Sequence, residues 1–330
     1  MKIVHSFWTK PWKKYLQTPK SLRSNVTLTA PNTGWADIET MLTVMHWSCH
    51  QAMSLYGEEN LVLITDSEGA ELLKEKFRLP YGTVLTVLDE IQDVDPAFWG
   101  YEKVVARSHM QEPFWHIDID WIFNKRLPSE FESADFVVRS LEGDVCINSV
   151  LGESPGFGYT PIWSNYSQAY SLLGRAPYIP DCLKKHANLK ISVNSGIFGG
   201  CNLDFIQECC SLAKQFVTHP GNSVLFGDLA DLGYRLEIFN FIFEKAIPAT
   251  LAIDKDINIH QVLPFKPYVD EGYNNLADDF KGMGIHHLMS AKAHKDVMAA
   301  SVDDRYFAYR SLKSQVAGMV EEINLELEKD

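Results

Sequence analysis

The chain has 330 residues, of which 46% are hydrophobic and 22% are charged, a composition typical of a folded globular protein. Its formal net charge is −13 and its longest basic run is residues 10–14, so an extended nucleic-acid footprint is not expected. No window reaches the roughly 18 apolar residues of a membrane span, and no leader pattern is present. A cytoplasmic protein without a transmembrane segment is therefore expected.

Short apolar runs alternate with segments of helical spacing through the first third of the chain. The predicted elements are strands at 2–8, 61–65 and 84–88, helices at 35–56, 68–77 and 95–108, and a strand that carries Asp118 and Asp120. Unbroken apolar strands between helices indicate an α/β fold, with a mostly parallel central sheet and helices on both faces. Ligands bind such sheets at the carboxyl ends of the strands. Trp8, Asp66, Asp118 and Asp120 fall there, so Trp8 and Asp66 are candidate ligand contacts, Trp8 to a nucleoside.

The rest of the chain adds a glycine- and proline-rich segment and several helices. Residues 152–163 hold three glycines and two prolines, which predict a long loop able to close over a ligand. A strand at 189–193 is predicted to run into a turn at 194–200. Helices are predicted at 203–217, at 236–251 and from 303 to the C-terminus.

Asp118 and Asp120 stand one residue apart at the end of an apolar run. On a strand, side-chain direction repeats every two residues, so both carboxylates are expected to face one ion. Carboxylate ligands and a diphosphate favour Mn²⁺ or Mg²⁺ over Zn²⁺. The alternative is a pair of exposed aspartates at a strand end, without a metal.

The segment 284–292 places a second group of ligand-type residues near the far end of the chain. His286 offers an imidazole, and Lys292, six residues on, is predicted to begin a helix. An ammonium at a helix start beside a metal suits a diphosphate, which needs both charge neutralisation and hydrogen-bond donors. The alternative is a turn with solvated histidines.

Three features in this order resemble the GT-A fold glycosyltransferases. They are the paired aspartates after a β-α-β-α-β half, the Asn-Ser-Gly-Ile turn at 194–197, and the element that runs from His286 to Lys292. The resemblance is strongest to the retaining galactosyltransferase and glycogenin-like branch, and it covers about residues 2–295. It implies a single GT-A, Rossmann-like domain over 1–330 with added C-terminal helices. The nucleotide-sugar-binding half is then 1–125 and the acceptor-side half 126–330.

The same resemblance implies roles for residues around a metal. Asp118 and Asp120 would bind the metal and the donor diphosphate, and His286 would complete the metal's ligands. Lys292 would contact the diphosphate. The implied cofactors are Mn²⁺ or Mg²⁺ and a nucleoside-diphosphate sugar, with a UDP-sugar as the first choice of donor.

Four further residues match the family's donor-sugar region. Lys103 lies near the family's basic donor contact, and Arg107 shares its helix face one turn later. Asn194 matches the family's asparagine near the donor sugar, and Glu244 matches the acidic residue near the reacting sugar. Asn194 and Glu244 are therefore the candidate catalytic residues, although a glutamate on a helix surface is the alternative for Glu244.

The chain departs from the family pattern at three positions. Met289 and Ala293 stand where the family's terminal element has Gly and Pro, and Lys245 follows Glu244 where the family has Gln. These differences put the pocket for the donor sugar in doubt more than the diphosphate contact.

The predicted function is metal-dependent transfer of a sugar, hexosyltransferase-like, to a carbohydrate or glycoconjugate acceptor. Negative charge develops on the departing diphosphate, which a metal and Lys292 would stabilise. Two alternatives remain. One is a non-catalytic nucleotide-sugar or carbohydrate-binding protein on the same fold. The other is a metal-dependent nucleotidyltransferase or phosphohydrolase, although the Gly-Ser helix start and third carboxylate of polymerase-like nucleotidyltransferases do not appear.

Overall fold

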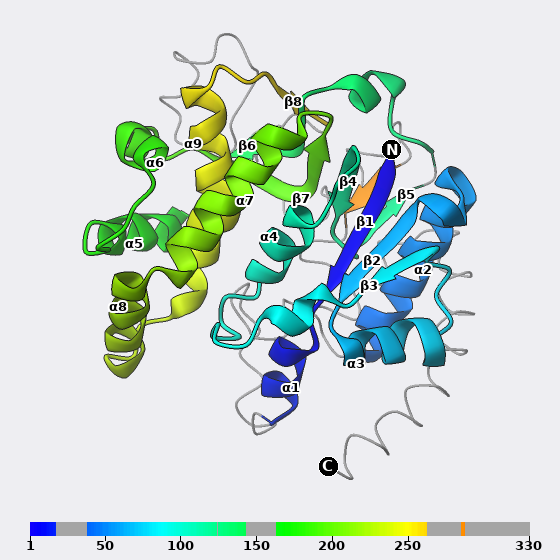
Figure 1. Ribbon diagram of the computed structural model, residues 1–330, viewed down its shortest axis with the longest axis horizontal. Coiled ribbons are helices and arrows are strands. Elements are labelled where there is room, and N and C mark those ends of the chain that lie inside the picture. Colours follow the sequence, from blue (N-terminus) through cyan, green and yellow to red (C-terminus); the bar gives the residue numbers. More distant parts are fainter. Residues whose placement is uncertain (18–37, 124, 143–162, 263–284, 288–330) are drawn as a thin grey trace, which may run out of the picture. The chain divides into compact units, whose positions relative to one another are not determined.

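The computed structural model describes residues 1–17, 38–123, 125–142, 163–262 and 285–287 (Figure 1). The contacts of the chain group into two compact units, each built from stretches that are distant in sequence. The first unit comprises Met1–Lys2, Glu90–Ile117 and Leu127–Asp270, and the second comprises Ile3–Asp89, Asp118–Arg126 and Glu271–Asp330.

Three parallel strands run through the second unit in the order β3-β2-β1. They are β1 (Lys2–Phe7), β2 (Leu61–Thr65) and β3 (Thr83–Leu85). Every residue of β2 is buried, so its apolar side chains need cover on both faces, and α2 (Ile38–Tyr56) and α3 (Ser67–Ala70) contact it. The remaining helices here are α1 (Thr9–Gln17), η2 (Glu58–Asn60), the π-helix η3 (Glu71–Lys76) and η4 (Val87–Glu90).

A two-stranded antiparallel sheet also belongs to the second unit. It joins β5 (Trp121–Phe123) to β9 (Ile285–His287), with Trp121 opposite His287 and Phe123 opposite Ile285. Helix α2 packs on β5, and the Ser48 hydroxyl donates a hydrogen bond of 2.6 Å to the Trp121 carbonyl. β5 is thus held between a helix and a strand that come from far apart in the sequence.

Four strands of the central sheet lie in the first unit in the order β4-β7-β6-β8, with both parallel and antiparallel pairing. β7 (Ser192–Gly200) pairs antiparallel with β4 (Phe114–Ile117) and β6 (Phe136–Glu142), and β6 pairs parallel with β8 (Ile259–Gln261). A Cβ at Gly199 would lie 1.9 Å from the Phe114 carbonyl oxygen, so only glycine allows β4 and β7 to approach this closely.

Helices supply the rest of the first unit, as Figure 1 shows. They are α4 (Tyr101–Ser108), η5 (Ser129–Ser133), α5 (Trp163–Leu173), α6 (Asp181–His186), η7 (Ala187–Leu189), α7 (Leu203–Thr218), α8 (Pro220–Asp231), η8 (Leu236–Phe239), the π-helix η9 (Phe241–Ala246) and α9 (Ile247–Asp254). Both η9 and α9 contact β7, and α7 contacts α4.

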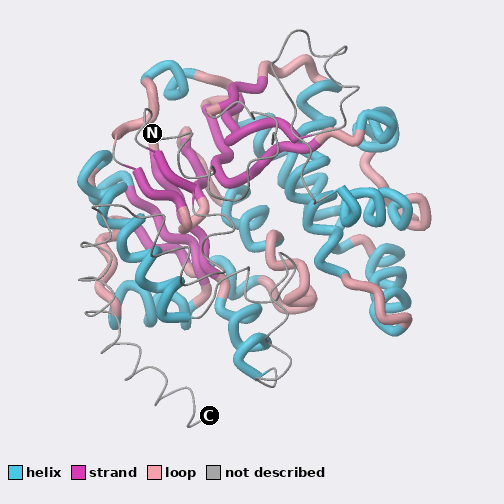
Figure 2. The backbone as a smooth tube through the Cα atoms, turned by 180° about the vertical axis from the view of Figure 1, so that it is seen from behind, coloured by secondary structure: helices cyan, strands magenta, loops and turns pink. Residues whose placement is uncertain are grey.

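The predicted α/β class with a mixed, mostly parallel set of strands is confirmed; Figure 2 shows strands in magenta and helices in cyan. The strands at the start of the chain and at 61–65 and the helix at 203–217 are confirmed within a residue or two. Gly57 ends α2 as expected, with φ 86°, a conformation that glycine adopts without steric cost. In the part of the chain that the structure describes, no helix is long and apolar enough to cross a membrane.

Several element boundaries were wrong. The third strand ends at Leu85, and α4 begins at Tyr101 because turns occupy residues 95–100. The turn predicted at 194–200 is strand, because β4 and β6 pair with β7 on its two sides and override the turn preference of Asn and Gly. The predicted loop at 152–162 and the C-terminal helix lie outside the described residues.

Candidate functional site

Asp118 and Asp120 lie in a turn between β4 and β5, so the prediction that one strand carries both was wrong. The Trp121 amide donates to the Asp118 carbonyl over 3.1 Å and closes this turn. Asp120 is 2% exposed and Asp118 is half-buried. Strand alternation therefore does not place these two carboxylates; their backbone lies in one turn instead.

β9 brings the far end of the chain to this turn. It pairs with β5 so that His286 lies opposite Ile122 and His287 lies opposite Trp121. Because β5 begins one residue after Asp120, the backbone of the two histidines runs beside the aspartate turn. The alternative interpretation, a turn with solvated histidines, does not hold for the backbone, because residues 285–287 form a strand. Lys292 lies outside the described residues.

The predicted metal set of Asp118, Asp120 and His286 stays a prediction. Among the residues searched, which are those the structure describes, no group of three or more His, Cys, Asp or Glu side chains is placed to hold a metal. For β9 the structure describes the backbone pairing and not the side chains. The proposal that Asp118, Asp120 and His286 bind a metal therefore depends on the backbone pairing of β5 with β9.

Trp8 and Asp66 directly follow β1 and β2, at the carboxyl ends where they were expected. Trp8 is 3% exposed, and the Lys10 ammonium lies 5.7 Å from the centre of its ring. The Trp8 side chain is therefore largely buried, with a cation beside its indole. Whether it contacts a nucleoside stays a prediction.

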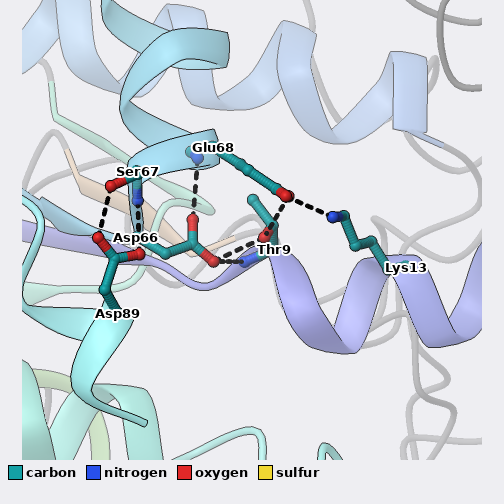
Figure 3. Close-up of polar contacts among 7 residues, drawn as sticks. Thr9, Lys13, Asp66, Ser67, Glu68 and Asp89 are labelled. Carbon is teal, nitrogen blue, oxygen red and sulfur yellow. Dashed lines mark hydrogen bonds and ion pairs between the residues drawn. The ribbon is translucent and has the colours of Figure 1, made fainter. Parts of the chain in front are cut away.

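Asp66 joins the starts of two helices (Figure 3). Its Oδ1 accepts a 2.8 Å hydrogen bond from the Gly69 amide in α3. Its Oδ2 accepts from the amide and the hydroxyl of Thr9, at 2.9 and 2.6 Å, where α1 begins. Asp89 reinforces the start of α3 by accepting from both the amide and the hydroxyl of Ser67. Asp66 thus has a clear structural role as a helix cap.

Lys103, Arg107 and Glu244, which the sequence placed in one donor region, meet in the first unit. Glu244 is fully buried, and its Oε1 lies 3.1 Å from the Lys103 ammonium and 3.9 Å from the Arg107 guanidinium. The alternative of a surface glutamate is excluded. Ser195, which the sequence reasoning did not assign, donates from its hydroxyl to the same Oε1 over 2.5 Å.

The charge of this buried cluster depends on the pairing of Glu244. Burial on its own raises the pKa of the Glu244 carboxyl, but Lys103, Arg107, Lys245 and the Ser195 hydrogen bond together lower it below its usual value. The carboxylate is therefore ionised at neutral pH. It can position cations, but it cannot act as a proton donor there.

The backbone around Glu244 is also adapted to it. Glu244 lies in the π-helix η9, and such short π segments often occur at functional sites. A Cβ at Gly100 would lie 2.6 Å from Glu244 Oε2, so a glycine is needed at that position. The Gly100 amide also donates a 2.7 Å hydrogen bond to Asn240 Oδ1. The need for Gly100 and Asn240 is visible only in contacts between segments that are distant in the sequence.

Asn194 does not join the Glu244 cluster. Neighbouring residues of a strand point to opposite faces, so Asn194 and Ser195 cannot both reach Glu244. The Asn194 amide donates to Glu142 Oε1 on β6 over 2.7 Å, and its Oδ1 accepts from the Gly196 amide over 3.2 Å. The two candidate catalytic residues are therefore held in separate networks of one unit.

The predicted site is thus divided between two units. The second unit carries Trp8, Asp66 and the aspartate turn with β9 beside it, while the first carries Lys103, Arg107, Asn194 and Glu244. A family model described as "Family of unknown function (DUF6734)" matches residues 1–312. The chain belongs to this family. No curated protein matches the DUF6734 chain.

Solved structures that match the DUF6734 chain include three transferases. Mouse xyloside xylosyltransferase 1 in its apo form is 11% identical, with 87% of this chain and 96% of that chain covered, at a TM-score of 0.37. An active-site mutant of LgtC is 10% identical, with 69% and 70% covered, at 0.29. Mannose-1-phosphate geranyltransferase from Thermus thermophilus is 13% identical, with 85% and 79% covered, at 0.32. These TM-scores are low, and the likeness carries no function over to this chain.

Proposed function

We propose that the chain is a metal-dependent glycosyltransferase. It would transfer a sugar from a nucleoside-diphosphate sugar, with a UDP-sugar as the first candidate, to a carbohydrate or glycoconjugate acceptor. The observation that carries the proposal is the pairing of β5 with β9. This pairing places the backbone of His286 beside the turn that holds Asp118 and Asp120.

The chemistry of these residues fits a hard divalent cation. Two carboxylates in one tight turn, with Asp120 almost wholly buried, suit Mn²⁺ or Mg²⁺, and an imidazole is a ligand that Mn²⁺ also accepts. Asp118, Asp120 and His286 would hold the ion. When bound, the ion would supply positive charge against the negative charge that develops on the leaving diphosphate.

Protein cations would add to that charge. We assign Lys292 to the diphosphate, where an ammonium stabilises the leaving group more in the transition state than in the substrate. Trp8 and Asp66, at neighbouring strand ends, would contact the nucleoside side of the donor. Asn194 would contact the donor sugar.

Glu244 would act through the cations that it holds. It fixes the Lys103 ammonium by an ion pair of 3.1 Å, and Lys103 is the member of the cluster with some solvent exposure, at 12% of its side chain. A fixed ammonium loses less conformational entropy when it binds a substrate oxygen than a free one does. Glu244 is then a positioning residue for Lys103.

Metal-dependent nucleotide binding tests the proposal. The affinity of the full chain for UDP is measured by calorimetry with Mn²⁺ and with EDTA, in the wild type, in Asp120→Asn and in the matched control Asp231→Asn. Asp231 is an exposed aspartate at the end of α8. We expect Mn²⁺ to strengthen UDP binding in the wild type and the control but not in Asp120→Asn. Equal Mn²⁺-dependent affinity in all three proteins would sink the metal site.

A further inference from the structure

A cavity of about 620 Å³ lies in the first unit and is lined by none of the predicted site residues. Its walls are the segment 90–95, one side of α4, the C-terminal end of α7 and one face of α8. All of these stretches belong to the same compact unit, so the cavity does not depend on how the two units are arranged.

The floor of the cavity is apolar. Phe98 and Phe226 meet edge to face with ring centres 4.9 Å apart, and Ile91, Val105 and Leu236 are among the other apolar residues that line the cavity. All five side chains are at least nine-tenths buried. A floor of this kind favours an apolar body and offers few hydrogen bonds to a neutral sugar.

The rim of the cavity is acidic. The segment 90–95 contributes the carboxylates of Glu90, Asp93 and Asp95. The Lys214 ammonium also lines the cavity, and it donates a 2.6 Å hydrogen bond to the Ser108 hydroxyl. Three carboxylates against one ammonium give the rim a negative potential that attracts cations.

The three rim carboxylates differ in how far other protein groups already contact them. Glu90 Oε2 lies 3.8 Å from the His109 ring, and Asp95 Oδ1 accepts a 2.8 Å hydrogen bond from the Ala97 amide. Asp93 has no hydrogen bond or ion pair to any residue that the structure describes. Asp93 is thus the carboxylate best placed to receive a ligand's charge.

Tyr101 adds a polar group that protein packing does not satisfy. It lines the cavity and is 6% exposed, and its hydroxyl forms no hydrogen bond with the described part of the chain. Burial raises the pKa of the Tyr101 phenol to about 12, so the hydroxyl keeps its proton at neutral pH. The hydroxyl oxygen is not fully buried, so it is open to water or to a ligand in the cavity.

Gly227 lies in the interior of α8 and faces the same cavity. Glycine is unfavourable inside a helix, and such a residue usually has a packing reason. A Cβ built at Gly227 meets nothing within 4 Å, so no neighbour requires a glycine. Its effect is to leave room in the cavity, next to Ser223 and Ala230 on the same face of α8.

We propose that this cavity binds a small organic cation, an ammonium group on an aryl or alkyl body. The apolar body would rest on Phe98 and Phe226, the ammonium would lie at the rim beside Asp93, and the Tyr101 hydroxyl would bond to a polar group of the ligand. This inference goes beyond the proposed sugar transfer and does not rest on it, because no residue of the metal or donor site lines the cavity.

The test compares three probes of one shape and different charge on the full chain. 2-Phenylethylammonium, 2-phenylethanol and 3-phenylpropionate are titrated at low salt by calorimetry. We expect the ammonium compound to bind at least roughly tenfold more tightly than the alcohol, with the carboxylate weakest, and the difference to shrink as NaCl screens the rim. Equal binding of the ammonium compound and the alcohol, or saturable binding of neither, overturns the proposal.

Two substitutions connect binding to this cavity. Asp93→Asn should remove most of the preference for the ammonium compound, while the matched control Asp231→Asn, outside the cavity, should keep it. Gly227→Leu should fill the cavity and weaken the binding of all probes. Gly227→Ala, which adds one methyl group into open space, provides a folded intermediate case. Unchanged ammonium affinity in both Asp93→Asn and Gly227→Leu contradicts the assignment.

Discussion

The Ser195 hydroxyl donates a hydrogen bond of 2.5 Å to Glu244 Oε1, joining β7 to the π-helix η9. The same oxygen receives the Lys103 ammonium, while Arg107 lies further away. An ionised carboxylate with no solvent exposure is tolerated only when it is paired in this way. The cluster thus supports the first unit and holds the Lys103 ammonium in a fixed position.

Replacing Glu244 by Gln should strongly destabilise the protein. Lys103 and Arg107 would lose a buried counter-charge, which costs roughly 3–5 kcal/mol for buried pairs. The exposed pair between Glu208 and Lys255 provides the control, because Glu208→Gln removes a solvent-screened surface ion pair and should change stability little. Urea unfolding of the two variants measures both changes. Similar small losses would show that the Glu244 pairing contributes little.

Alanine at two helix-associated glycines should change stability in opposite directions. Gly100→Ala places a Cβ 2.6 Å from Glu244 Oε2 and 3.0 Å from Asn240 Oδ1, which should cost roughly 1–3 kcal/mol through overpacking. Gly227→Ala meets no neighbour and should stabilise α8 by about 1 kcal/mol. Thermal unfolding followed by circular dichroism measures both variants. A lower melting temperature for Gly227→Ala would contradict the open space described beside it.

Asp66→Ala should destabilise the second unit by removing a cap from two helices. Each lost cap costs roughly 0.5–2 kcal/mol, so the total should be roughly 1–4 kcal/mol. Glu68→Ala is the neighbouring control, because its contact with Lys13 is exposed. Chemical denaturation compares the two variants. An effect of Asp66→Ala as small as that of Glu68→Ala would show that the caps are weak.

Stability should fall as the solution is acidified from neutral pH, in part because of His5. Burial lowers the pKa of His5 from 6.5 to about 4, so the folded state keeps this imidazole neutral while the unfolded chain takes up a proton below pH 6.5. The contribution of neutral His5 is complete above pH 6.5 and is lost as the pH falls toward 4, by about 2 kcal/mol at pH 5. His5→Asn should show a correspondingly smaller loss between pH 7 and 5. Parallel pH profiles for the two proteins would contradict this.

Local sequence patterns predicted the elements of the fold better than the geometry of the site. Apolar runs and helical spacing predicted β1, β2 and α7 because burial and periodicity are local properties. The turn at Asp118 to Asp120 was missed because strand propensity does not show where a strand breaks. Residues 194–200 of β7 were predicted to be a turn because their pairing partners lie far away in the sequence.

Pairing between distant segments also explains what the sequence could not supply at the site. Lys103 and Glu244 were placed in one region by resemblance, and the structure joins them by an ion pair. Local sequence does not reveal the roles of Ser195 and Gly100, because these roles lie in contacts with Glu244 from other elements. Asn194 was grouped with Glu244, yet strand alternation turns it toward Glu142.

Identification of the nucleotide released from sugar nucleotides tests the central claim most directly. Purified protein is incubated with a panel of UDP- and GDP-sugars, with Mn²⁺ or with EDTA, alongside the Asp118→Asn/Asp120→Asn double variant. The account predicts release of a nucleoside diphosphate that needs Mn²⁺ and is lost in the double variant. Release of a nucleoside monophosphate, or diphosphate release that persists in EDTA and in the double variant, would contradict it.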